Sequence, residues 1–197
     1  MSPASEQDAQ VRAREIVREV LVEAFGASAT PFVPVPFVDD WMLARVLQRI
    51  AGKVMARHGL DSPSLPRAIV DGYVKEGATP LAKSILVGAA RFVVRKVAIV
   101  LDVKKSHDVF GESIAFALAL DIGAVNGWAH DAGAARLGGA IHRSLAVVGS
   151  GALEALMRAG REAVAGGQLQ IGDAIGREIE QIRAQIEPVL RRELPAT

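Results

Sequence analysis

The 197-residue sequence predicts an all-α fold, a bundle of six or seven helices around a central apolar helix rich in alanine and glycine. Three observations predict this fold class. Apolar residues recur every three or four positions along most of the chain, which is the spacing of one helix face. Capping residues, prolines and glycines mark helix starts and ends. Half of the residues are hydrophobic although only 5% are aromatic, as in closely packed helices or in a protein that contacts lipid. We treat residues 1–197 as a single helical domain.

The N-terminal region, residues 1–30, contains the first predicted helix, from Ser5 to Phe25. Charged residues of both signs separate its apolar positions, and this pattern favours an amphipathic helix that faces the core. A membrane-surface helix is the alternative, although the polar face of such helices is usually basic. The apolar stripe comprises Ala9, Ala13, Ile16, Val17, Val20, Leu21, Ala24 and Phe25.

Three prolines in the segment 31–37 disfavour a regular helix and favour extended backbone. Phe32 and Phe37 make this segment apolar, so we do not expect it to be a solvated linker. Asp39-Asp40 then supplies the cap of a second helix, which Gly59 ends. The apolar positions of this helix are Leu43, Val46, Leu47, Ile50 and Val54.

Two further helix starts follow in the sequence. The connector 61–66 leads into a short helix from Arg67 to Glu76, and Thr79-Pro80 leads into a predicted helix from Leu81 to Val103. The second of these includes the most basic part of the chain, which we interpret either as a solvated face or as a contact for anionic lipid. Its cationic residues are Arg91, Arg95, Lys96, Lys104 and Lys105.

A break at 106–108 is predicted to precede a nearly all-apolar helix from about Val109 to Ala129. Such a helix must be buried in protein or in lipid, and we expect it to be the central helix, with a membrane-inserted hairpin arm as the alternative. Asp121, the charge in the middle of this helix, requires a partner such as Arg91, Arg95 or Arg136. Small residues at every fourth position would let another helix approach closely, and they are Ala115, Ala119, Gly123 and Gly127.

The chain is predicted to end in two more helices. The first runs from Ile141 to Val164 and is kinked at two glycines. The second belongs to an amphipathic region at 168–197, which Pro188 kinks or ends. Its apolar residues follow a heptad spacing, so it either docks on the bundle or forms an oligomerisation seam with another chain. The seam residues are Ile171, Ile175, Ile179, Ile182 and Ile186.

The composition and the motif search exclude several functions. A formal net charge of +1 argues against general nucleic-acid binding, and the absence of cysteine excludes disulfides and thiolate sites. The sequence contains no phosphate loop, no nucleophile elbow and no paired-histidine metal motif. No apolar run meets the usual length and charge test for a membrane-spanning helix. We therefore expect a non-enzymatic protein without catalytic residues, cofactor or metal.

The segment Pro34-x-Pro36-x-x-Asp39, followed by Leu43, Gln48, Ile50 and a helix that closes at His58-Gly59, resembles a motif of YcjF-type and EcsC-type bacterial helical domains. The resemblance covers about thirty residues (31–59), and His58 stands where those domains have tyrosine. Such domains are alanine-rich, helical and membrane-associated, and the YcjF type is often encoded beside or fused to Era-like GTPases. The resemblance therefore implies a membrane-linked role, with a separate GTPase as a candidate partner.

Together these observations predict a cytoplasmic protein that is peripheral at the bacterial inner membrane, where it binds lipid or scaffolds a membrane complex. Phe25, Phe32, Phe37 and Trp41 are the candidates for insertion, and the basic residues between 91 and 105 are the candidates for head-group contact. One alternative is a soluble helical homo-oligomer or adaptor. Another is a bundle with a pocket for an apolar ligand such as an acyl chain.

Overall fold

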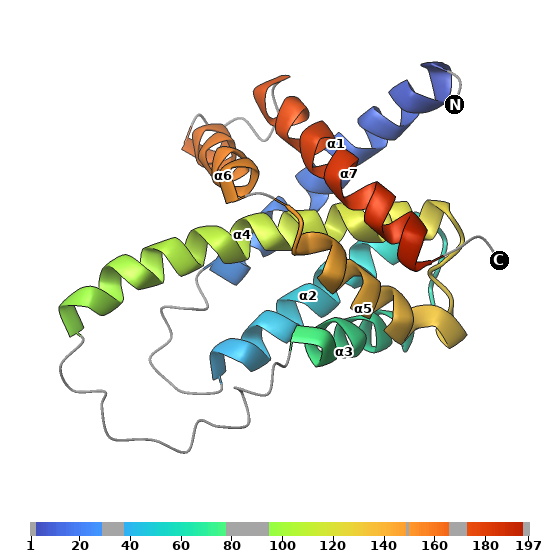
Figure 1. The fold of residues 1–197 in the computed structure, drawn as a ribbon, viewed down its shortest axis with the longest axis horizontal. Coiled ribbons are helices and arrows are strands. Elements are labelled where there is room, and N and C mark those ends of the chain that lie inside the picture. The colour runs from blue at the N-terminus through green and yellow to red at the C-terminus, as the bar shows by residue number, and fades with distance from the viewer. Residues whose placement is uncertain (1–2, 29–37, 78–94, 149, 166–172, 195–197) are drawn as a thin grey trace.

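The computed structural model describes residues 3–28, 38–77, 95–148, 150–165 and 173–194. Every regular element in these ranges is helical, which confirms the predicted all-α class. Figure 1 shows the long helix α4 crossing the molecule, with α6 and α7 on one side, α2, α3 and α5 on the other, and α1 passing across it. The elements are α1 (Pro3–Ser28), α2 (Val38–Arg57), α3 (Leu65–Gly77), α4 (Arg95–Val125), the short 3₁₀ helix η3 (Asp131–Gly133), α5 (Ala134–Leu145), α6 (Ser150–Ala165) and α7 (Asp173–Glu193).

The first two helices follow their predicted apolar patterns, but Asp39 and Asp40 do not cap α2, because the helix already begins at Val38. The stripe of α1 is buried from Ala13 to Ala24, and its solvent side carries the charged residues. Helix α2 ends at Arg57, and the expected Gly59 terminates it with a φ of 69°, a left-handed conformation that suits glycine. The amide of Gly59 donates to the carbonyl of Ala56, and the amide of Leu60 donates to that of Met55, both at 3.0 Å. These two bonds form a Schellman cap, which satisfies carbonyls that the helix leaves open.

Helix α4 is continuous through residues 106–108, so the predicted break there is wrong. The capping-type residues of that stretch disfavour a helix only weakly, and tertiary packing commonly overrides such preferences. The helix ends four residues earlier than expected, at Val125. Gly127, with φ 73°, forms a second Schellman cap there, in which the amide of Trp128 donates to the carbonyl of Gly123 at 2.9 Å.

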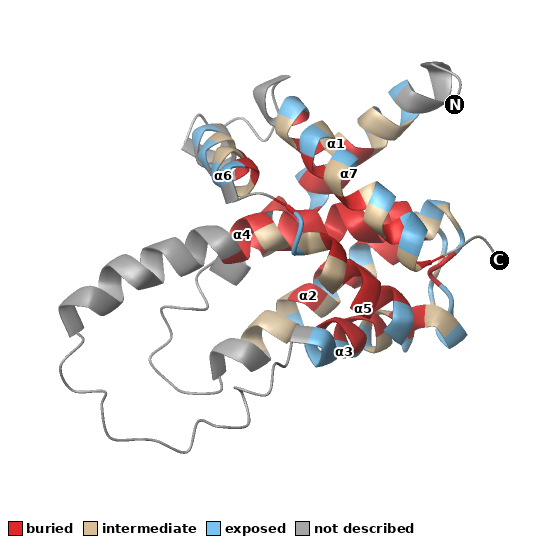
Figure 2. Ribbon diagram, viewed as in Figure 1, coloured by how far each residue is buried: buried red, intermediate tan, exposed pale blue. Residues whose placement is uncertain are grey.

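The hydrophobic core surrounds the second half of α4, which contacts α1, α2, α5, α6 and α7. Residues 109–123 of this helix are buried except for Glu112, which is partly exposed. Figure 2 shows the buried residues gathered where α4 meets the neighbouring helices. Phe110 and Phe116 are two of the largest fully buried side chains. This part of α4 is therefore enclosed by the chain's own helices.

Helices α3 and α5 approach each other closely, and this approach depends on two glycines. A Cβ added at Gly72 would lie 2.1 Å from the carbonyl oxygen of Ala135, and one at Gly138 would lie 1.9 Å from that of Ile69. No side chain fits at either position without moving a helix backbone. In α4, a Cβ at Gly123 would instead meet only the side chain of Leu137, at 2.9 Å. Gly123, one of the small residues of α4 expected to let another helix approach, thus faces a side chain of α5 and not a backbone.

The C-terminal third differs from its predicted pattern in its first helix. The helix predicted from Ile141 to Val164 is two helices, because α5 ends at Leu145 and α6 begins at Ser150. Helix α7 continues past Pro188 to Glu193. Three of the predicted seam residues of α7 lie in the chain's own core, where they are at most 1% exposed: Ile179, Ile182 and Ile186.

Candidate functional site

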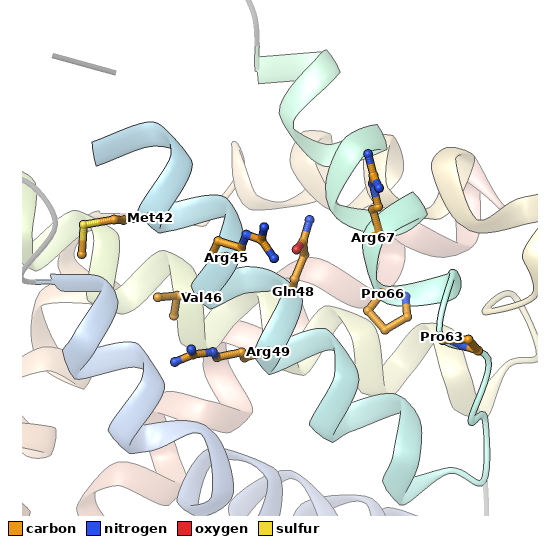
Figure 3. A pocket seen from close by; sticks show the side chains of 8 residues that line it. All are labelled: Met42, Arg45, Val46, Gln48, Arg49, Pro63, Pro66 and Arg67. Atoms are coloured by element: carbon orange, nitrogen blue, oxygen red, sulfur yellow. The ribbon is translucent and has the colours of Figure 1, made fainter. Parts of the chain in front are cut away.

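A cleft of about 600 Å³ between α2 and α3 contains three arginines. Arg45 and Arg49 come from α2, and Arg67 comes from the first turn of α3. Figure 3 shows Arg45 and Gln48 beside each other on α2, with Arg67 on the neighbouring helix. The remaining lining residues are Met42, Val46, Pro63 and Pro66, so the described lining contains no carboxylate. The cleft therefore combines a positive charge with an apolar surface.

The periodicity of α2 determines which of its residues line this cleft. Met42, Arg45, Val46 and Arg49 are spaced by three and four residues, so they share one face of the helix. The opposite face carries the core residues Leu47, Ile50 and Val54, which are buried. Packing of this core face directs Arg45 and Arg49 to the exposed side. Their spacing of four residues, opposite an apolar stripe, is the sequence signal that could have identified them.

On the surface formed by α1 and α2, two cations make direct ion pairs with carboxylates. There, Arg57 pairs with both Glu15 and Glu19, and Lys53 pairs with Glu23 at 2.5 Å. In the cleft, Arg67 pairs with Asp71 at 3.7 Å, and both side chains are mostly exposed. Among the described residues, Arg49 has no ion-pair partner. An anion that enters the cleft would therefore meet Arg49 and Arg67 with little competition from a described carboxylate.

A second charged cluster surrounds Asp121, whose side chain is fully buried in α4. Arg12 Nε donates to its Oδ1 at 3.0 Å, and Arg183 donates to its Oδ2 at 3.0 Å. His58 Nε2 also lies 3.0 Å from Oδ1. These partners join α1, α7 and the end of α2 to α4. None of them was a predicted partner, and Arg136 donates instead to the backbone oxygen of Glu193, at 3.1 Å.

We assign this second cluster a structural role. Arg12 and Arg183 border a cleft of about 570 Å³, but its lining also includes the carboxylates Asp8, Glu180 and Glu187. Both guanidinium groups are already bonded to Asp121. The cleft between α2 and α3 is therefore the better candidate for recognition of an anion.

A third group of polar side chains joins α3, α4 and α5. The Tyr73 hydroxyl donates to Glu112 Oε1. The Tyr73 ring makes edge contacts with Phe116 and His142, at centroid distances of 5.1 and 5.2 Å. Burial raises the pKa of Tyr73 well above its ordinary value, and the charge and hydrogen bond of Glu112 raise it further. The phenol therefore stays protonated in the folded protein.

Raising the pH is expected to destabilise the protein above about pH 10, where the phenol of an unfolded chain ionises. The unfolded chain releases this proton near pH 10 and the folded chain retains it, so the free energy of unfolding falls as the pH rises. Tyr73 is the only tyrosine in the chain, so tyrosinate absorbance reports on it alone. We expect this absorbance to increase together with the loss of helical circular dichroism. An increase near pH 10 in a fully helical protein would contradict the buried phenol.

The structure describes few of the residues predicted to contact a membrane. Phe25 is partly buried and packs on Phe110 with 4.6 Å between ring centroids, so we remove it from the insertion candidates. Phe32, Phe37, Arg91 and Ile171 lie outside the described residues. The backbones of the following residues lie in described helices but their side chains are not described: Trp41, Arg95, Lys96, Lys104, Lys105 and Ile175.

No protein-family model, curated protein or solved structure matches the chain. Among the described helices, none is both long and apolar enough to cross a bilayer.

Proposed function

We propose that this protein is a non-enzymatic, peripherally membrane-associated protein that binds anionic lipid through the cleft between α2 and α3. The observation that carries the proposal is the presence of three arginines, and of no carboxylate, in the described lining of one cleft. A guanidinium group presents a planar set of donors that matches the oxygens of a phosphate. Phosphate head groups of lipids are therefore the ligands that Arg45, Arg49 and Arg67 would bind best.

The position of the cleft in the chain supports a lipid as the source of the phosphate. Met42 and Val46 lie on the same outer face of α2 as Arg45 and Arg49 and line the cleft with them. Arginine side chains can lie along such apolar surface and hold their charged ends at the height of the head groups. Helix α2 begins at Val38, directly after the apolar residues 31–37 in the sequence. The resemblance of residues 31–59 to membrane-associated domains supports the same role.

Replacing all three cleft arginines with glutamine is expected to weaken binding to anionic vesicles by roughly a hundredfold, because each cation near a charged surface contributes about 1 kcal/mol. Binding is measured by co-flotation with phosphatidylcholine vesicles, with and without phosphatidylglycerol. We expect the wild-type protein to float only with phosphatidylglycerol, and less in moderate than in low salt, because salt screens the attraction.

A matched control separates the cleft from overall charge. Arg18, Arg158 and Arg177 are exposed residues of α1, α6 and α7, and they line none of the described clefts. Their replacement with glutamine removes the same three charges and is expected to leave most of the flotation intact. Equal losses in the two triple variants would contradict a specific role of the cleft. Absence of wild-type flotation with either vesicle would contradict membrane association itself.

A further inference from the structure

A smaller pocket of about 220 Å³ lies beside Glu112 and His142, and it shares no lining residue with the arginine cleft. Glu112 belongs to the middle of α4, and His142 belongs to the last turn of α5. The other walls of the pocket are apolar and come from α4, α5, the connector 146–148 and α6. They are formed by Ala115, Leu145, Ala146, Val148 and Leu153. The pocket is thus an apolar space with two polar groups in its wall.

These polar groups have unused hydrogen-bonding capacity. His142 Nδ1 is buried, and no residue in the described ranges accepts from it or donates to it. A buried polar atom of this kind normally bonds to water or to a ligand. Glu112 accepts the hydroxyl of Tyr73 through Oε1. A carboxylate offers about four acceptor positions on its two oxygens, so acceptor capacity remains after that bond. The His142 ring makes an edge contact with Tyr73, whose hydroxyl bonds to Glu112, and both His142 and Glu112 line the pocket.

We propose that this pocket binds a small molecule with an apolar body and one hydrogen-bond-donating head group, a hydroxyl or an ammonium. The apolar walls would cover the body, and Glu112 and the Nδ1 atom of His142 would accept from the head. A carboxylate head group is disfavoured because it would meet the negative charge of Glu112. An apolar cavity of 150 Å³ holds benzene, so a pocket of about 220 Å³ has room for a benzene ring with one short substituent.

Four probes of nearly equal size test the head-group requirement: benzylamine, benzyl alcohol, toluene and benzoate. Binding is measured by titration calorimetry on the full chain near neutral pH, where benzylamine is an ammonium. We expect benzylamine to bind at least roughly tenfold more tightly than toluene, with benzyl alcohol between them, because a bond to a charged group is the stronger one. Benzoate is expected to bind more weakly than toluene. Equal affinity for all four probes, or binding of none, would overturn the proposal.

Substitutions then locate the binding in this pocket. Ala146 is exposed at the rim, so Ala146→Phe should fill the space without disturbing the core, and it is expected to lower benzylamine affinity at least roughly tenfold. Ala56→Phe, at an exposed position of α2 that lines none of the described pockets, is the matched control and should leave the affinity unchanged. Benzylamine binding that survives Ala146→Phe would overturn the assignment to this pocket.

The charge of Glu112 can be removed without changing its shape. In Glu112→Gln the side-chain oxygen can still accept from Tyr73, so folding should be retained, and circular dichroism checks this. We expect benzylamine to lose roughly tenfold in affinity and benzoate to gain, since the repulsion is gone. The imidazole ¹⁵N resonances of wild-type protein give an independent readout. Saturation with benzyl alcohol should shift those of His142 and leave those of His58 in place. Unchanged probe preference in Glu112→Gln, or an unmoved His142, would overturn the proposal.

Discussion

Replacing Asp121 with alanine is expected to lower the free energy of unfolding by about 3–5 kcal/mol, the cost of removing one partner from a buried ion pair. The carboxylate is fully buried and bonds to Arg12, Arg183 and His58 at 3.0 Å each. Without it, two partly buried guanidinium groups and an imidazole lose this partner, and among the described residues Arg183 keeps only its bond to the carbonyl of Ala9. They would have to rearrange toward water, which would loosen the contacts of α1 and α7 with α4. Urea denaturation followed by circular dichroism measures the change.

An exposed aspartate provides the control for this experiment. Asp71 pairs with Arg67 at 3.7 Å on the surface of α3, and its side chain is 66% exposed. We expect Asp71→Ala to change stability by less than about 0.5 kcal/mol, as is usual for such pairs. A loss below about 1 kcal/mol in Asp121→Ala would mean that the buried network contributes little. An unchanged dependence on urea concentration would confirm that both variants unfold from the same folded state.

Gly138→Ala is expected to destabilise the protein by about 3 kcal/mol, the upper range for overpacking a well-filled interior. The added methyl group would lie 1.9 Å from the carbonyl oxygen of Ile69 and 2.7 Å from the amide nitrogen of Tyr73. Both atoms belong to the backbone of α3, so no side-chain rotation can make room. Helices α3 and α5 would have to separate, and this would open the contact around Tyr73. Thermal and urea unfolding measure the loss.

The same substitution in α2 should have the opposite sign. A Cβ at Gly52 would meet no atom within 4 Å, and the residue lies inside a helix. Alanine restricts the unfolded chain more than glycine does and favours a helix, so Gly52→Ala is expected to stabilise the protein by about 0.5–1 kcal/mol. If the two variants had equal stability, the close approach of α3 and α5 would be contradicted.

Local patterns were sufficient for the elements whose signals lie close together in the sequence. The stripe of α1 faces the core because apolar residues at three- and four-residue spacing form one face of any helix. Gly59 ends α2 because glycine adopts the left-handed conformation at low cost. Failures occurred where several local signals competed. The capping-type residues 106–108 did not interrupt α4, whereas Gly127, interpreted as one of a row of small packing residues, is the cap that ends it.

Only part of the candidate site could be predicted from the sequence. The predicted basic residues between 91 and 105 were conspicuous because they are neighbours in sequence. The arginine cleft takes Arg45 and Arg49 from one helix and Arg67 from the next, so its charge becomes concentrated only when α2 and α3 pack together. In the same way, the pocket beside Glu112 requires α4, α5 and α6 to be in place.

The sequence by itself determined the all-α class, the core-facing sides of α1 and α2, and the need for a partner at Asp121. Periodicity, caps and the cost of a buried charge act on residues within a few turns of one another, so they can be read without a structure. Only the tertiary structure decided which partners satisfy Asp121, because they are 109, 63 and 62 residues away in the chain. It also decided which glycines permit close packing. A missing Cβ matters only where another backbone comes within reach, as the backbone of α3 does at Gly138.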